Sequence, residues 1–82
     1  MRLDKYLKVS RLIKRRTVAN EACDAGKVLV NGKVARASYE VKIDDVITVS
    51  LGARQLRAQV VSVQETVAKN DAALLYRVLP EN

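Results

Sequence analysis

The dipeptide Asn31-Gly32 restricts the fold of this chain more than any other feature of its sequence. It lies between two short apolar runs at residues 28–30 and 34–35. Asn followed by Gly is the pair that most readily takes the positive φ angles of a two-residue hairpin turn. The sequence therefore predicts a β-hairpin over residues 28–35.

Further strands are predicted after this hairpin. Residues 46–51 alternate between apolar and polar side chains, which is typical of a strand with one buried face. Residues 56–61 alternate in the same way, and the apolar run at 73–79 predicts one more strand. We expect residues 64–72 to form an exposed loop.

Two helices are predicted before the hairpin. Leu3 and Leu7 are four residues apart and so share one side of a helix, which we place at residues 2–9. Asp4 lies in the first turn of this helix, where its charge favours the helix N-terminus. The alternative is that the Asp4 carboxylate orients a neighbouring Arg or Lys.

After a connector at residues 10–13, a second helix is expected at residues 14–25, and Gly26 ends it. Its apolar face is predicted to consist of Val18, Ala19, Ala22 and Cys23. We interpret Cys23 as a small core residue, and a reactive thiol is the alternative. Arg16 and Asn20 lie one turn apart on a different face, from which Arg16 is expected to point toward a partner.

Positive charge is concentrated in the first half of the chain. The 82 residues carry a net charge of +6. Residues 1–36 hold ten Lys or Arg against three acids, whereas residues 38–82 hold five against six. This asymmetry favours a polyanionic partner, either nucleic acid or an anionic membrane surface. A solvated basic face without a partner is the alternative.

Several classes of protein are excluded by what the chain lacks. It has no His and one Cys, so it forms no internal disulfide and none of the usual zinc sites, which suits a reduced, cytoplasmic setting. No apolar run is long enough to span a membrane. Asp44 and Asp45 are adjacent in a predicted turn and are expected to face solvent. With no recognisable catalytic group or glycine-rich phosphate loop, we predict a single domain that is not an enzyme and has no cofactor.

Three motifs occur in an order that resembles the S-four RNA-binding domain. They are Arg-Leu-Asp-Lys-Tyr-Leu at residues 2–7, Ser-Arg at 10–11, and Gly-Lys-Val-Leu-Val-Asn-Gly-Lys-Val at 26–34. The segment after Gly52 looks like the heat-shock-protein-fifteen branch, which includes short bacterial proteins of ribosome-associated quality control. The resemblance implies an α+β fold with two N-terminal helices packed on a small, mostly antiparallel sheet, the alpha-L motif. It also implies a single domain over residues 1–82, with an S-four core at residues 1–50 and a C-terminal strand extension at residues 51–82.

A function is implied by the same resemblance. Such proteins bind dissociated large ribosomal subunits that still carry peptidyl-tRNA, and they assist a larger factor that adds alanine tails to stalled nascent chains. The expected partners are therefore large-subunit rRNA, peptidyl-tRNA and that factor, with no membrane contact and a monomer away from the ribosome. The alternatives are a general basic rRNA- or DNA-binding accessory protein, a membrane-surface protein, and a targeting module of an RNA-modifying enzyme.

The candidate RNA contacts are the basic residues of the first half. These are Arg2, Lys5, Lys8, Arg11, Lys14, Arg15, Arg16, Lys27 and Lys33, with Asp4, Asn31 and Gly32 in support. Arg suits a phosphate contact because its planar fork donates two hydrogen bonds and keeps its charge when partly desolvated. The stretch at residues 14–19 departs from the family pattern, so the family's Arg position could correspond to Arg15 or to Arg16.

Overall fold

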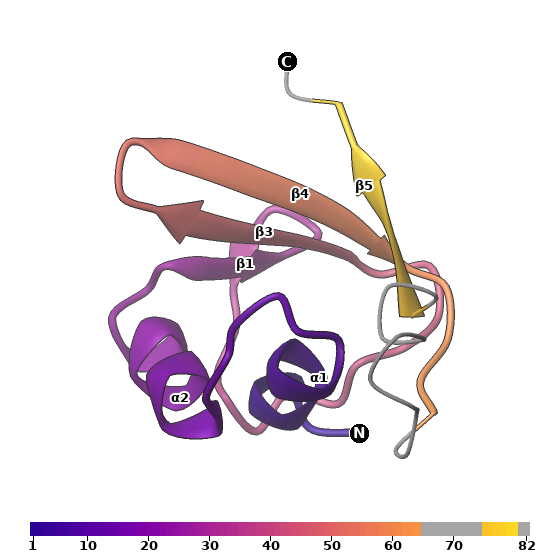
Figure 1. Ribbon diagram of the computed structural model, residues 1–82, viewed down its shortest axis with the longest axis horizontal. Coiled ribbons are helices and arrows are strands. Elements are labelled where there is room, and N and C mark those ends of the chain that lie inside the picture. The colour runs from indigo at the N-terminus through magenta and orange to yellow at the C-terminus, as the bar shows by residue number, and fades with distance from the viewer. Residues whose placement is uncertain (65–74, 81–82) are drawn as a thin grey trace.

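A five-stranded antiparallel sheet with two helices on one face makes up the fold (Figure 1). The computed structural model describes residues 1–64 and 75–80. The elements in chain order are α1 (Leu3–Val9), α2 (Arg16–Asp24), β1 (Val28–Val30), β2 (Lys33–Val34), β3 (Val46–Leu51), β4 (Arg54–Val60) and β5 (Tyr76–Leu79). The strands lie in the order β2-β1-β3-β4-β5, and all neighbours are antiparallel. The predicted α+β arrangement of two N-terminal helices on an antiparallel sheet is confirmed.

The predicted hairpin is present as β1 and β2, with Leu29 opposite Val34. Asn31 has φ 52° and Gly32 has φ 84°, and both values fall in the left-handed region that the predicted turn requires. The Asn31 side chain adds a second function: its carbonyl oxygen accepts the backbone N–H of Val46 at 3.0 Å. Asn31 therefore shapes the turn and also connects it to the start of β3.

Asp45 is buried, so the expectation that both carboxylates of the Asp44-Asp45 pair face solvent is wrong for this residue. Three donors surround its carboxylate: the Tyr39 hydroxyl at 2.9 Å, the Lys42 backbone N–H at 3.0 Å and the Asn31 side-chain amide at 3.1 Å. Burial alone would raise the pKa of the Asp45 carboxyl, but these hydrogen bonds hold it below its ordinary value. A pattern of neighbouring acids could not reveal these donors, because two lie in the connection that precedes β3 and the third, Asn31, lies in the hairpin turn.

The helices are shorter than predicted, and one of their apolar residues is misplaced. α2 begins at Arg16 and not at Lys14. Ala19 and Cys23 of α2 are buried as expected, whereas Val18 is 48% exposed. Ala19 and Cys23 are one turn apart and define the line of contact, and Val18 is rotated by about 100° from Ala19. The core position of Cys23 is thus confirmed, and the assignment of Val18 to the buried face is wrong.

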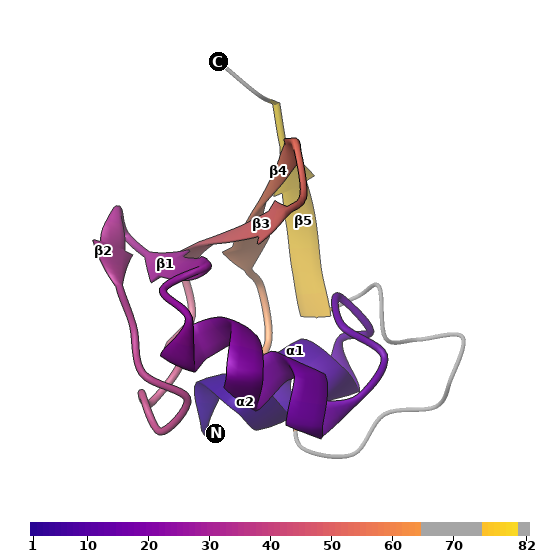
Figure 2. The same cartoon turned by 90° about the vertical axis from the view of Figure 1, so that its left-hand side faces the viewer.

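Figure 2 shows both helices on one side of the sheet. The buried core residues come from the helices, the strands and the segments between them. The largest fully buried side chains include Leu3, Tyr6 and Leu7 of α1 and Ile47 of β3. The buried Tyr6 hydroxyl donates a hydrogen bond to the backbone carbonyl of Leu75. The residue that precedes β5 is therefore hydrogen-bonded to α1.

The C-terminal strands are confirmed with revised bounds. The strand expected at 56–61 spans 54–60, and the strand expected at 73–79 spans 76–79. Residues 73–74 of the second prediction lie outside the described residues, as does the predicted loop at 64–72 except for Gln64. None of the described helices has the length and apolar character needed to cross a membrane.

Candidate nucleic-acid interface

The carboxylate of Asp4 contacts two Arg side chains, one from the residue before α1 and one from the start of α2. Asp4 is only 2% exposed. Arg2 donates to it twice, from Nε to Oδ1 at 3.2 Å and from Nη2 to Oδ2 at 3.4 Å. Arg16, the first residue of α2, forms an ion pair with Oδ2 at 3.4 Å through its Nε. Asn20 donates to the same oxygen at 3.3 Å. We call Arg2, Asp4, Arg16 and Asn20 the Asp4 cluster.

These contacts support both interpretations of Asp4. Its Oδ1 also accepts the backbone N–H of Lys5 at 2.8 Å, so Asp4 does interact with the start of α1. Burial alone would raise the pKa of the Asp4 carboxyl, but hydrogen bonds from Arg2, Asn20, Arg16 and the Lys5 amide hold it below its ordinary value. Asp4 therefore orients the neighbouring Arg side chains and also interacts with the N-terminus of α1.

The Asp4 cluster keeps a positive charge that a phosphate can use. Two guanidinium groups share one carboxylate, so one positive charge is left over. The side chains of Arg2 and Arg16 are 50% and 49% exposed. Each guanidinium has five N–H donors, and the carboxylate accepts at most two from each. Within residues 1–64 and 75–80 neither guanidinium has a further acceptor, so the other donors can engage a ligand.

Two open surface hollows meet at the Asp4 cluster. One is lined by Asp4 of α1 and by Arg16 and Asn20 of α2. The other extends from Arg2 and Asn20 to Arg36 in the segment after β2. Arg36 is exposed and was counted in the basic half of the chain but not assigned to the candidate contacts. The sequence placed Asn20 one helical turn after Arg16 but did not indicate that it takes part in the site. That spacing was the one sequence signal that could have included it.

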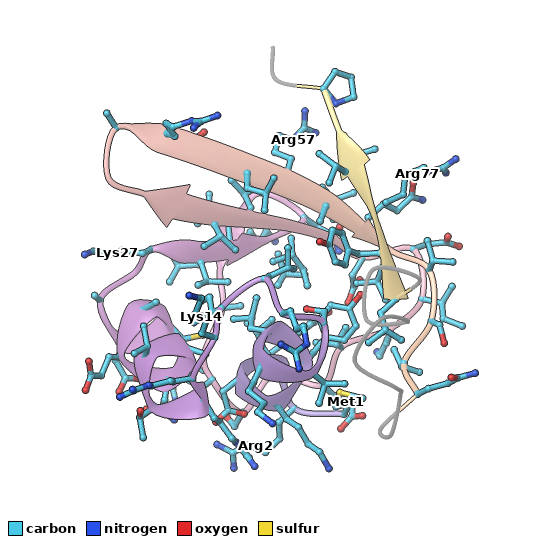
Figure 3. The ribbon with its side chains drawn as sticks, viewed as in Figure 1. Met1, Arg2, Lys14, Lys27, Arg57 and Arg77 are labelled. Atoms are coloured by element: carbon cyan, nitrogen blue, oxygen red, sulfur yellow. The ribbon has the colours of Figure 1, made fainter. Side chains whose placement is uncertain are left out.

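The other candidate residues do not converge on the Asp4 cluster. Arg2 lies on the side of the helices that faces away from the sheet, whereas Lys27 lies at the edge where β1 begins (Figure 3). Lys33 begins β2, and Arg15 directly precedes α2. The remaining positions are Lys5 and Lys8 on α1, and Arg11 and Lys14 in the connector between the helices. All nine are exposed except Lys5, which is half-buried. The structure thus brings Arg2 and Arg16 together and spreads the others around the helices and the hairpin.

Arg11 has a backbone conformation that is costly for its residue type. It follows the C-cap of α1 with φ 63°, a left-handed value usually occupied there by Gly. Its amide donates to the carbonyl of Lys8, so the conformation closes the helix. The backbone at Arg11, a candidate contact residue, is therefore strained. Backbone strain of this kind is often found at functional sites.

The match to a family model decides the classification of this fold. The model described as "S4 domain" matches residues 1–47, which include both helices and the hairpin. The chain belongs to the S4 domain family. The resemblance inferred from the three sequence motifs is thereby confirmed.

Similar proteins agree with this membership over the whole chain. Two relatives named "RQC P-site tRNA stabilizing factor", from Halalkalibacterium halodurans and Bacillus subtilis, are each 49% identical over 81 residues. The matches cover 99% of this chain and 92% and 94% of the relatives. A solved structure of heat shock protein 15 from Vibrio cholerae, described as trimeric, is 31% identical with a TM-score of 0.89 and covers 96% of this chain and 81% of that one. The similarity to the heat-shock-protein-fifteen branch is also confirmed.

No group of three or more potential metal ligands occurs among the residues that the structure describes. Cys23 is buried, and burial first, then the nearby charges of Asp4 and Asp24, raise the pKa of its thiol to about 11. Because the thiolate is the nucleophilic form, the raised pKa disfavours the reactive state of Cys23 at neutral pH. The chemistry that the described surface offers is the binding of anions by guanidinium groups.

Proposed function

We propose that this chain is a non-catalytic RNA-binding adaptor that docks on the large ribosomal subunit and its P-site peptidyl-tRNA during the rescue of stalled ribosomes. The Asp4 cluster carries this proposal, because it holds two half-exposed guanidiniums in fixed positions on one face. The names of the relatives from H. halodurans and B. subtilis support the assignment of P-site tRNA as a partner. Arg2 and Arg16 are the primary contacts, and the other basic residues of the helices and hairpin add to them.

Structured RNA suits this surface better than a lipid surface does. A helix that lies on a membrane needs a broad apolar face left free to enter the lipid. Here Leu3 and Leu7 of α1 and Ala19 and Cys23 of α2 are buried against the rest of the protein. The exposed face of the helices carries Arg and Lys, which bind phosphates. A general basic protein that binds rRNA or DNA without a role in quality control is the second candidate, and its support is the charge asymmetry alone.

Three finer assignments belong to this proposal. The adaptor assists a larger factor that adds alanine tails to the stalled nascent chain, it works in the cytoplasm, and it is a monomer away from the ribosome. Analytical ultracentrifugation tests the last point, and a stable trimer such as the one described for the Vibrio cholerae relative would contradict it. A reconstituted tailing reaction tests the first: addition of the protein should lengthen the alanine tails.

The decisive experiment compares two single substitutions by co-sedimentation with large subunits that carry peptidyl-tRNA. Arg16→Ala should weaken binding by about 1.5 to 3 kcal/mol, the usual range for a hydrogen bond to a charged group. Arg54→Ala removes the same charge from the tip of the β3–β4 hairpin and should leave binding unchanged. Equal losses from both variants would indicate a non-specific basic protein, and no loss from Arg16→Ala would refute the assigned face.

Subunits without tRNA provide a second comparison. If P-site tRNA forms part of the binding site, the protein should bind subunits with peptidyl-tRNA more tightly than vacant ones. Equal affinity for both would assign the contacts to rRNA alone. Double-stranded DNA of similar length is the control for general attraction to phosphates, which salt weakens strongly.

A further inference from the structure

The outer face of the sheet carries a second set of basic side chains. In the register of the sheet, Arg57 of β4 lies opposite Thr48 of β3, and Gln59 lies opposite Arg77 of β5. Opposed residues share a face, and the buried Ile47 pairs with Ala58 on the other one. Arg57 and Arg77 therefore lie on the face away from the helices, which no element drawn as helix or strand covers in Figures 1 and 2. We call Arg57 and Arg77, with Gln59 and Thr48 beside them, the sheet patch.

Among the residues that the structure describes, one acid borders the sheet patch: Oδ1 of Asp44 accepts a hydrogen bond from the Gln59 side-chain amide at 3.4 Å. Within residues 46–64 and 75–80 there are three Arg and no Asp or Glu. Arg77 donates to the side-chain oxygen of Gln59 at 3.1 Å, and Arg57 donates to the backbone carbonyl of Pro80 at 3.5 Å. Neither guanidinium forms an ion pair with any residue that the structure describes. Within the described residues, the acceptors that both guanidiniums contact are therefore uncharged, and their positive charge is available to an external anion.

The sheet patch has a spacing that suits consecutive groups on one anionic strand. Arg57 pairs with Leu79, so Arg57 and Arg77 are diagonal neighbours across β4 and β5. Diagonal neighbours in an antiparallel pair are about 7 to 8 Å apart at their backbones, and long side chains reach well beyond that. Two such guanidiniums can contact neighbouring phosphates of one nucleic-acid strand.

Position separates the sheet patch from the Asp4 cluster. Arg2 lies below the helices in Figure 3, whereas Arg57 and Arg77 lie beside β4 and β5 at the opposite end of the molecule. The helices and the core are between the two surfaces. A single RNA helix that contacts the Asp4 cluster cannot also reach the sheet patch without wrapping around the protein.

We propose that the sheet patch binds the phosphate backbone of a second RNA segment, so that the protein bridges two RNA segments that approach it from opposite sides. This inference rests on the proposed function, which supplies a setting where separate RNA segments meet. RNA is favoured over an acidic protein surface because the diagonal spacing of Arg57 and Arg77 suits neighbouring phosphates of one strand, and the exposed Val78 is on the other face of the sheet, opposite Ala58. If an acidic protein binds the sheet patch instead, photocrosslinking from position 55 will give crosslinks to protein and not to RNA.

Photocrosslinking from two positions tests the bridge directly. A photoreactive amino acid replaces the exposed Gln55, which lies on the outer face two residues before Arg57, or the exposed Thr17 on α2. On large subunits with peptidyl-tRNA, each position should crosslink to RNA, and the two crosslinked segments should differ. Crosslinks from position 55 to protein only, to the same nucleotides as position 17, or to nothing would overturn the bridge. If position 17 fails to crosslink to RNA, it is the proposed function that fails.

Paired substitutions measure the contribution of the sheet patch. The double variant Arg57→Gln with Arg77→Gln should bind large subunits about tenfold or more weakly, and the slope of log affinity against log salt should become shallower by about 2. The control Arg54→Gln with Lys42→Gln also removes two charges, both from exposed positions outside either surface. Equal losses in the two double variants would overturn the proposal, as would no loss in the first. Urea unfolding of all variants checks that the fold is intact.

Discussion

The side-chain amide of Asn20 donates a hydrogen bond to Oδ2 of Asp4 at 3.3 Å and thereby connects α2 to α1. The same carboxylate holds Arg2 and Arg16. The relative position of the two helices and the direction of the two guanidiniums therefore depend on one buried acid. A change at Asp4 affects the binding face as a unit.

Asp4→Asn should weaken binding to large subunits even though it makes the protein more positive. Without the carboxylate, Arg2 and Arg16 lose their fixed positions, and ordering a long side chain on binding costs about 0.5 to 1.5 kcal/mol for each. We expect a loss of about 1 to 3 kcal/mol in a co-sedimentation assay. Asp24→Asn, an exposed acid of α2, makes the same change in charge and should not weaken binding. Tighter binding by the Asp4 variant would mean that net charge and not orientation controls affinity.

Arg11→Gly should stabilise the fold while it weakens RNA binding. A non-glycine residue in the left-handed region costs about 1 to 2 kcal/mol, and Gly avoids this cost at φ 63°. Part of that gain is offset because Gly is more flexible in the unfolded chain, so an increase of up to about 1 kcal/mol in the free energy of unfolding is expected. Arg11→Ala is the control that removes the charge without relieving the strain. A binding affinity unchanged in both variants would remove Arg11 from the interface.

Salt should weaken binding in a predictable way. If roughly four to six phosphates are neutralised, log affinity for a large-subunit rRNA fragment should fall against log salt with a slope of about −3 to −5. The motivation is the excess of Lys and Arg in residues 1–36. A titration over several salt concentrations gives the slope, and a flat dependence would contradict the electrostatic account of binding.

Cys23 should behave as a core residue in two measurements. Since burial raises the pKa of its thiol to about 11, the folded protein should react slowly with thiol reagents at pH 8, and unfolded protein should react fast. Cys23→Ala should lower the free energy of unfolding by about 1 kcal/mol and leave RNA binding intact, because the cavity is small. A folded Cys23→Ala variant that cannot bind RNA would show that Cys23 has been misinterpreted.

Acid should destabilise the protein through Asp4 and Asp45. Both carboxyls have a pKa in the folded state below the ordinary value, which is about 3.9 in the unfolded chain. Their contribution is therefore complete above about pH 4 and is lost as the pH falls through the lowered folded values. Urea unfolding at pH 6 and pH 3 should show a drop in stability that is smaller in Asp45→Asn. The same drop in both proteins would exclude Asp45 as a cause.

Local features of the fold could be predicted from the sequence, and features that depend on distant residues could not. The prediction of the hairpin was correct because Asn31 and Gly32 determine the turn by their own backbone preferences. The strand at 46–51 was correct because alternation directly reports a half-buried sheet. The prediction that Val18 is buried was wrong because its neighbours in sequence do not show which side of α2 meets α1 and the sheet.

The binding face shows the same division. Arg2 and Arg16 could be chosen from their type and position, whereas their shared carboxylate depends on how two helices pack. Asn20 is 16 residues from Asp4, and no local pattern links them. The family resemblance was visible because its motifs lie on α1 and the hairpin. The sheet patch was missed because the alternation of β4 and β5 shows that they are strands, but their pairing is needed to bring Arg57 beside Arg77.

The hydrogen bond between Tyr6 and Leu75 has a consequence for how this protein is made. The acceptor for the Tyr6 hydroxyl is 69 residues further along the chain. During synthesis, residues 75–79 must leave the ribosome before that hydroxyl can find its partner and β5 can pair with β4. A copy whose own synthesis stops before Leu75 leaves α1 without this contact. Translation must therefore pass Leu75 before α1 can form this contact with the segment that leads into β5.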